Sequence, residues 1–148
     1  MSESEGVETV LAPVDGSEES LRAAEYAVAL AERYGARLHA CYVFDEAVGR
    51  RVALGETDAA ALAERSERAM TAVRERCAGV ELTHATAYGF SPTMKTRHPG
   101  TAVLDAADEV AADFIVLPRE PVSGAPDEPL EKAAGYVPGH AVQPVLSV

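Results

Sequence analysis

The sequence has little of what marks membrane, redox or metal-binding proteins. Its longest apolar runs fall far short of the ~20 residues that a bilayer-spanning helix needs, so we expect no membrane span. Cys41 and Cys77 are too distant along the chain for a metal knuckle or a redox pair, and we interpret both as buried structural thiols. The spacing of His39, His84 and His140 matches no metal-ligand motif, and we predict no metal site and no catalytic histidine.

Positive charge is also scarce. The chain has 13 Lys and Arg residues against 24 Asp and Glu residues, which gives a net charge of −11. A field of this sign repels nucleic acid and anionic lipid, so we expect neither as a partner. The acidic excess, with Lys95 and Lys132 as the only lysines, favours a halophilic protein, although ordinary solubility explains the same composition. The N-terminal stretch MSESEGVE is acidic and has no apolar signal region, which favours a cytoplasmic location.

Apolar runs alternate with amphipathic stretches along the whole chain. With 148 residues, 47% of them apolar, we predict one domain over residues 1–148, in which residues 1–6 form a flexible N-terminal tail. Short apolar runs predict strands over 7–14, 37–44, 80–87, 113–117 and 144–148, with helices between them. This order indicates parallel βαβ units, and therefore a doubly wound α/β fold, a three-layer sandwich.

The predicted fold would bring two segments to one ligand-binding crevice at the carboxyl ends of the strands. Asp15 follows the first strand and the Pro118–Pro121 turn follows the fourth. Ser17 and Gly35 are suited to begin and end the helix between the first two strands. Ser17 and Ser20 have no evident His–Asp partners, so we interpret them as capping residues and predict no catalytic residue.

Three stretches of the sequence resemble the universal stress protein family, of the HUP superfamily. They are VLAPVDGSEESLRAAEYAVALAERYGARLHACYVF, TAVLDAADEVAADFIVLP and VQPVLSV. The resemblance implies a Rossmann-like, five-stranded, mainly parallel sheet in the order 3-2-1-4-5. It also implies a homodimer, or a heterodimer with a paralogue, through the last strand, in which the contact residues are Pro144, Val145, Leu146, Ser147 and Val148. The short apolar edge strand is itself suited to pairing with another chain.

In the ATP-binding members of that family, an aspartate after the first strand contacts adenine, and a Gly-x-x-Gly, a spacer of nine residues and a Gly-Ser or Gly-Thr hold the ribose and phosphates. The resemblance places Asp15 at the aspartate position. The glycine positions carry Pro118 and Pro121, and the Gly-Ser position carries Glu131 and Lys132. Proline has no N–H to donate to a phosphate, and Glu131 adds negative charge. We therefore predict that family-type ATP binding is lost and expect no cofactor, with ATP as the remaining possibility.

Two further features leave alternatives open. Asp15 is either an adenine contact or a turn residue whose carboxylate caps local N–H groups. Lys95, Arg97 and His98 form the most basic patch, which either seats an anion or an acidic partner surface or is a solvated loop. Beyond these positions, Gly135, Pro138 and Gly139 predict that the helix after the fourth strand ends within about two turns.

Together these features favour a non-catalytic stress-response and regulatory domain that acts as a dimer through contacts with an unidentified protein partner. The alternative is a regulator that binds ATP or AMP through Asp15 and the 93–98 loop in a non-standard pose. An ATP-using enzyme has the least support, because neither a phosphate loop nor a nucleophile arrangement is present in the sequence.

Overall fold

A parallel sheet of five strands, in the order β3-β2-β1-β4-β5, forms the centre of the computed structural model. The model describes residues 7–44, 50–52, 54–56, 59–77, 79–88, 99–119 and 129–148. The strands are β1 (Thr9–Val14), β2 (Arg37–Phe44), β3 (Leu82–Tyr88), β4 (Phe114–Leu117) and β5 (Val145–Ser147). The α/β fold class and the strand order expected from the sequence are confirmed.

Strand β1 lies at the middle of the sheet because every one of its residues is suited to burial. All six residues from Thr9 to Val14 are buried, as a strand covered on both faces requires. On one side Val14 lies opposite Tyr42 of β2, and on the other Leu11 lies opposite Ile115 of β4. The carboxyl end of β1 is therefore flanked by β2 and β4.

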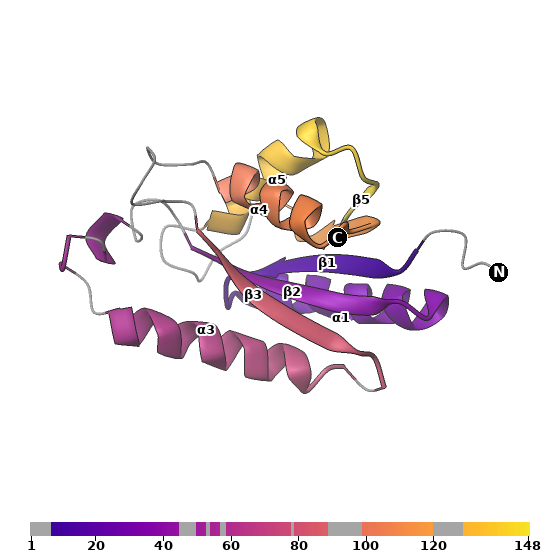
Figure 1. The fold of residues 1–148 in the computed structure, drawn as a ribbon, viewed down its shortest axis with the longest axis horizontal. Coiled ribbons are helices and arrows are strands. Elements are labelled where there is room, and N and C mark those ends of the chain that lie inside the picture. Colours follow the sequence, from indigo (N-terminus) through magenta and orange to yellow (C-terminus); the bar gives the residue numbers. More distant parts are fainter. Residues whose placement is uncertain are drawn as a thin grey trace.

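Four helices cover the sheet in two layers (Figure 1). Helices α1 (Glu18–Tyr34) and α3 (Ala59–Arg74) lie on one face, and α4 (Pro99–Glu109) and α5 (Pro129–His140) lie on the other. Two apolar clusters follow from this arrangement. The first packs alternate residues of β1 and β2, such as Val14 and Tyr42, against α1 and α3, and the second packs Leu11 and Ile115 against α4 and α5.

Helix α1 begins and ends at the residues that the sequence predicts. The Oγ of Ser17 accepts a hydrogen bond from the N–H of Ser20 at 3.1 Å, which satisfies one of the free donors of the first turn. Gly35 follows the helix with φ of 65°, a left-handed conformation that glycine adopts without steric cost. Both caps are confirmed.

Helix α5 is longer than the sequence suggests, and the expectation of about two turns is wrong. It runs for 12 residues, from Pro129 to His140, and includes Gly135, Pro138 and Gly139. Pro129 begins the helix at a position where a missing N–H costs nothing. Pro138 lies in the last turn, so only the hydrogen bonds at the end of the helix are affected. Buried Leu130, Ala133 and Val137 hold the helix on the sheet.

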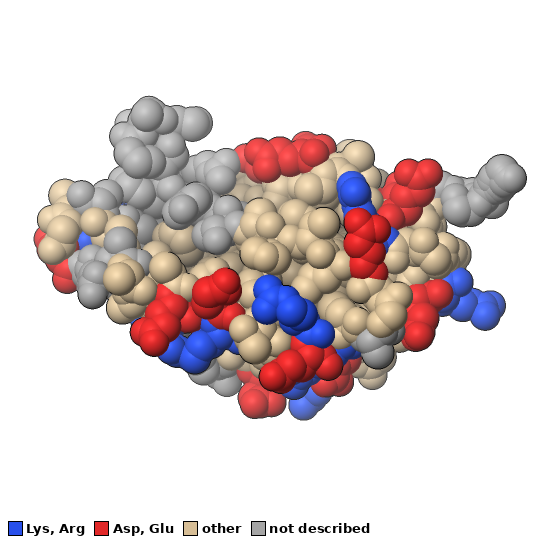
Figure 2. All heavy atoms as spheres, turned by 60° about the horizontal axis from the view of Figure 1, so that its bottom comes forward, with Lys and Arg blue, Asp and Glu red and all other residues tan. Residues whose placement is uncertain are grey.

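Acidic and basic side chains are interspersed on the face that α1 and α3 form (Figure 2). Two ion pairs contribute to this pattern: Arg76 contacts Glu25 at 2.9 Å, and Arg68 contacts Glu64 at 3.8 Å. Neither pair is fully buried, so each stabilises the fold only slightly. Among the described residues, no helix is long and apolar enough to cross a membrane.

Candidate functional site

Asp15 is the first residue after β1 and lies at the carboxyl end of the sheet, as the sequence predicts. It is only 4% exposed. Its Oδ1 accepts hydrogen bonds from the N–H of Ser17 at 3.0 Å and from the Oγ of Ser17 at 2.6 Å. One carboxylate oxygen therefore helps to cap α1, in agreement with the structural interpretation of this residue.

The second carboxylate oxygen of Asp15 has no such partner. Its Oδ2 is enclosed by the protein and makes no hydrogen bond. A buried acceptor without a donor loses its hydration and gains nothing in return, which costs about 1–3 kcal/mol. An oxygen in this state at the ligand-binding end of a doubly wound sheet is a candidate contact for a bound molecule.

Tyr42 of β2 and Arg65 of α3 belong to the same end of the sheet. Tyr42 lies opposite Val14, the residue before Asp15, and its side chain points to the face covered by α3. Burial raises the pKa of the Tyr42 hydroxyl, and Asp15 raises that pKa further, while the hydrogen bond and positive charge of Arg65 oppose the rise. Both Asp15 and Arg65 are therefore within electrostatic range of one phenol.

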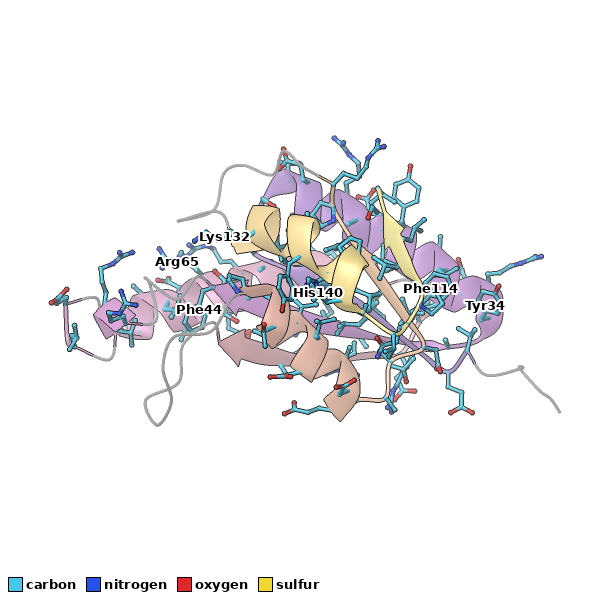
Figure 3. All side chains as sticks on the ribbon, turned by 90° about the horizontal axis from the view of Figure 1, so that it is seen from above. Tyr34, Phe44, Arg65, Phe114, Lys132 and His140 are labelled. Carbon is cyan, nitrogen blue, oxygen red and sulfur yellow. The ribbon has the colours of Figure 1, made fainter. Side chains whose placement is uncertain are left out.

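Arg65 also has an unpartnered buried atom. The side chain is half-buried, and its Nε is enclosed without a hydrogen-bond acceptor. Asp15 Oδ2 and Arg65 Nε are the two buried side-chain atoms without a partner in the described part of the chain. One is an acceptor and the other a donor, and both residues influence the pKa of Tyr42. Figure 3 shows Arg65 at the same end of the molecule as Phe44, the last residue of β2.

The segment after β4 differs from a phosphate-binding turn. Pro118 is buried directly after the strand and has no N–H to donate. The next N–H, that of Arg119, donates to the carbonyl oxygen of Val148 at 2.8 Å. The N–H of Val148 in turn donates to the carbonyl oxygen of Leu117 at 3.1 Å. Both of the first backbone positions after β4 are therefore unable to donate to a bound anion.

The other predicted site residues are only partly described. Lys132 lies in the first turn of α5, is exposed, and appears in Figure 3 at the same end of the molecule as Arg65. Glu131 lies beside it in the helix, and its side chain is outside what the structure describes. Pro121 and the basic patch of Lys95, Arg97 and His98 also lie outside the described residues.

The predicted interface residues lie at one edge of the sheet. Strand β5 pairs with β4, in which Leu117 lies opposite Ser147, and it is the last strand in the sheet order. Val145 contacts the second apolar cluster, while Leu146 remains 37% exposed. Pro144 is exposed and Val148 is half-buried. Among the described residues β5 pairs with β4 alone, and this edge presents apolar side chains that another chain could cover.

Arg65 and Tyr42 were not among the residues that the sequence singled out. The charged run from Glu64 to Arg68 indicates a solvated helix face, and Arg65 is part of that run. The helical period would have indicated that Arg65 is partly buried. Arg65 follows Leu62 by three residues and precedes Ala69 by four, so the three residues lie on one face of the helix. Leu62 and Ala69 are both buried, so the stem of Arg65 lies beside the buried stripe of α3.

The fold defines a Rossmann-like α/β domain, and the unpartnered oxygen of Asp15 marks a candidate small-molecule site at the carboxyl end of β1. The model of the family described as "Universal stress protein family" matches residues 6–148. The chain belongs to the universal stress protein family.

Solved structures share the fold over nearly the whole chain. The universal stress protein UspA from Lactobacillus plantarum is 25% identical, with a TM-score of 0.67, and the match covers 95% of this chain and 97% of that one. A universal stress protein in complex with cAMP is 22% identical, with a TM-score of 0.65 and 96% of each chain covered. A universal stress protein from Archaeoglobus fulgidus in complex with dAMP is 20% identical, with a TM-score of 0.63, and 95% of this chain and 96% of that one are covered. Comparison with curated proteins gives no match.

Proposed function

We propose that the chain is a non-catalytic, cytoplasmic regulatory domain of the universal stress protein family that has lost family-type ATP binding and acts through protein contacts. The turn after β4 carries this proposal. A phosphate loop needs backbone N–H groups that face the anion. Pro118 has none, and the N–H of Arg119 is occupied by the carbonyl of Val148. Neither position offers an N–H to an anion, which supports the proposed loss of ATP binding.

The contacts around Asp15 support a role without catalysis. The hydroxyl of Ser17 donates to Asp15 Oδ1 at 2.6 Å, and the hydroxyl of Ser20 donates to the carbonyl oxygen of Ser17 at 2.9 Å. Both serine hydroxyls are buried and engaged in capping α1. A nucleophile needs a hydroxyl held by a general base and open to a substrate, and neither serine meets this requirement.

The exposed edge of β5 supports the proposed assembly. Leu146 is 37% exposed and the nearby Val142 is 90% exposed, which leaves apolar surface beside unpaired strand edge. A second copy of the chain, or a paralogue, that pairs with β5 would cover both. A dimer formed in this way would leave the opposite edge of the sheet, formed by β3, available to a further protein partner.

Calorimetric titration with Mg-ATP, at low and at high salt, tests the loss of ATP binding. We expect no binding heat from a protein that circular dichroism shows to be folded and light scattering shows to be dimeric. A matched variant that replaces Pro118, Pro121 and Glu131 by Gly and Lys132 by Ser restores the glycine pattern, and we expect it to bind more strongly. Micromolar Mg-ATP binding by the unmodified protein that Asp15→Ala abolishes would contradict the proposal.

A second candidate function is a regulator that binds a nucleotide without needing a triphosphate cradle. The buried, unpartnered Oδ2 of Asp15 favours it. The relatives in complex with cAMP and dAMP hold ligands with a single phosphate, which need fewer anion contacts than ATP does. Titration with AMP and cAMP tests this candidate. Binding that Asp15→Asn weakens would support it, and the absence of binding by the folded protein would remove it.

A further inference from the structure

Helix α1 has a stripe of large apolar side chains outside the core. Tyr26 is 52% exposed and Tyr34 is 46% exposed, and Leu30 between them is half-buried. Each follows the last by four residues, so the three side chains lie along one flank of the helix. Grouped apolar side chains that remain in solvent mark a surface that binds another molecule.

This flank of α1 faces away from α3. Glu25 marks the α3 side, because it forms the ion pair with Arg76, just after the end of α3. At about 100° per residue, the stripe is turned by roughly 100° to 180° around the helix from Glu25. Helix α3 packs on β2 and β3, whereas α1 packs on β1 and reaches β4. The flank opposite α3 therefore lies toward β4 and β5.

Strands β4 and β5 extend the stripe into a broader apolar surface. Phe114 and Val148 are half-buried and pack against the apolar cluster beneath α1. Val145 packs on the opposite face of the sheet, so its neighbour Leu146 points to the α1 face, where it is 37% exposed. Figure 3 shows Tyr34 and Phe114 at the same end of the molecule. We name this surface the α1 ledge, formed by Tyr26, Leu30, Tyr34, Phe114, Leu146 and Val148.

The two faces of the sheet are covered unequally beside the ledge. On the opposite face, α5 packs on β5. On the α1 face, the described helices α1 and α3 pack on the other four strands, and the exposure of Leu146 shows that β5 is left partly uncovered. A stripe from Tyr26 to Tyr34 extends about 12 Å along the helix at 1.5 Å per residue. The uncovered surface thus has the length of two helical turns and lies where a further helix would continue the layer.

The rim of the ledge is basic, although the chain as a whole is acidic. Arg22 and Arg33 are exposed on the solvent side of the stripe. Arg119 is exposed after β4, and its N–H donates to the carbonyl oxygen of Val148 at 2.8 Å. The ion pairs of α1 and α3 described above involve other arginines. Against these three positive charges, Glu19 is the half-buried acidic side chain on the same flank of α1.

We propose that the α1 ledge binds an amphipathic helix of a partner protein, in which apolar residues recur every four positions and are flanked by Asp and Glu. The inference rests on the proposed function, in which the domain acts through protein contacts, and names the surface and the chemistry of the partner. A helix along the ledge would cover Tyr26 and Tyr34 with its apolar side. Its carboxylates would meet Arg22 and Arg33, whereas these residues would repel a basic helix.

The ledge and the proposed dimer use different parts of the sheet edge. Strand pairing at β5 takes place in the plane of the sheet through backbone groups. The stripe of α1 lies above that plane, and Leu146 is the outer boundary between the two surfaces. A dimer paired at β5 therefore leaves Tyr26 and Tyr34 open to a partner.

Fluorescence anisotropy of labelled peptides tests the inference. The probe is a designed peptide of about 16 residues, long enough to form a helix, with Leu at every fourth position of one face and Glu beside it. One control peptide replaces every Glu by Lys, and the other has the same residues in scrambled order. We expect the acidic peptide to bind the folded full-length chain about tenfold more tightly than either control, with an affinity that decreases as salt is added.

Variants of the chain locate the binding surface. Tyr26→Ala and Tyr34→Ala are each expected to weaken binding of the acidic peptide about tenfold, because exposed aromatic residues at the centre of an interface contribute most of its affinity. Leu54→Ala is the matched control, since Leu54 is 64% exposed and lies outside the ledge, and it should leave binding unchanged. The circular dichroism of all three variants should match that of the unmodified protein.

Charge reversal tests the basic rim. The double variant Arg22→Glu and Arg33→Glu is expected to weaken binding of the acidic peptide about fivefold and to strengthen binding of the basic peptide. Equal affinity for the acidic and basic peptides in the unmodified protein would overturn the proposed chemistry of the partner.

Further outcomes separate the ledge from the proposed function. The absence of binding by the acidic peptide, or binding that Tyr26→Ala and Tyr34→Ala leave unchanged, would overturn the ledge. A Tyr26→Ala protein that light scattering shows to be monomeric would mean that a second copy occupies the ledge, which also overturns the partner helix. None of these results concerns ATP, so the proposed loss of ATP binding stands or fails separately in the Mg-ATP titration.

Discussion

Gly100 of α4 lies directly against Tyr136 of α5. A Cβ atom at position 100 would be 2.5 Å from the Cδ1 and 2.8 Å from the Cβ of Tyr136. Tyr136 also stacks on His140, with ring centroids 3.9 Å apart, so it has little freedom to move. The close packing of the two helices on this face of the sheet therefore depends on the absence of a side chain at Gly100.

Replacement of Gly100 by Ala is expected to destabilise the protein by about 1–3 kcal/mol, because Tyr136 or the helix must shift to make room. Urea denaturation followed by circular dichroism measures this change. Gly139→Ala is the matched control, because Gly139 lies in α5, the partner helix of α4, and a Cβ atom at this position would meet nothing within 4 Å. Equal effects of the two substitutions would show that the contact with Tyr136 is unimportant.

Ala111 is expected to be a site of stored backbone strain. It follows α4 with φ of 52°, a left-handed conformation that costs a residue with a Cβ about 1–2 kcal/mol. Ala111→Gly should therefore raise the melting temperature by a few degrees, after allowance for the greater flexibility of glycine in the unfolded chain. Gly35→Ala, at φ of 65° after α1, is the reverse change and should lower the melting temperature. A decrease for Ala111→Gly would contradict this explanation.

Asp113 connects two segments that are distant in sequence. Its Oδ2 accepts hydrogen bonds from the N–H of Glu8 at 2.8 Å and from the N–H of Thr9 at 3.1 Å. Asp113→Ala leaves both donors unpaired at the start of β1 and is expected to lower the free energy of unfolding by about 1–2 kcal/mol. Asp108→Ala, at an exposed position of α4, is the control. The prediction fails if the two variants unfold at the same urea concentration.

His39 should make stability depend on pH. It is 7% exposed, and its Nδ1 lies 2.7 Å from Thr83 Oγ1. Burial lowers its pKa below 6.5, and the charges of Arg37 and His84 lower the pKa further against the opposing effect of Glu109. The unfolded chain therefore binds the proton more readily, so the contribution of His39 to stability is complete above pH 6.5 and decreases as the pH falls below that value.

Replacement of His39 by Gln is expected to remove this part of the pH dependence. Urea denaturation measures the free energy of unfolding of both proteins at about pH 7.5, 6.5 and 5.5, values chosen to bracket the usual histidine pKa. The slope of this free energy against pH is then compared between the two. The loss of stability between the first and last pH should be smaller in the variant. Parallel curves for the two proteins would exclude a role for His39.

The sequence predicts correctly those parts of the structure that contacts between neighbouring residues determine. Ser17 and Gly35 determine the ends of α1 through contacts within a few residues, and both were predicted correctly. The length of α5 was not, because the packing of its apolar residues on the sheet outweighs the intrinsic cost of Gly135 and Pro138. Propensity along the chain contains no information about that packing.

The candidate site likewise contains one residue that the sequence predicts and one that it does not. Asp15 could be placed from the strand that precedes it, since the carboxyl end of a parallel strand is where ligands bind. Arg65 could not, because its half-buried position depends on how α3 lies over β2, and the lack of an acceptor for its Nε is visible only in the structure. Its charged neighbours indicate solvent, and only the three-dimensional contact with Tyr42 separates it from them.

The sheet order also determines when the protein can fold during synthesis. The central strand β1 pairs with β2 soon after it emerges, but its other neighbour, β4, begins at Phe114. A ribosome must therefore translate about a hundred residues more before the middle of the sheet has both neighbours, at roughly 5–20 residues per second. Until then β1, whose residues after Thr9 are all apolar, has one unpaired side, which exposes the nascent chain to aggregation for longer than a fold built from local contacts.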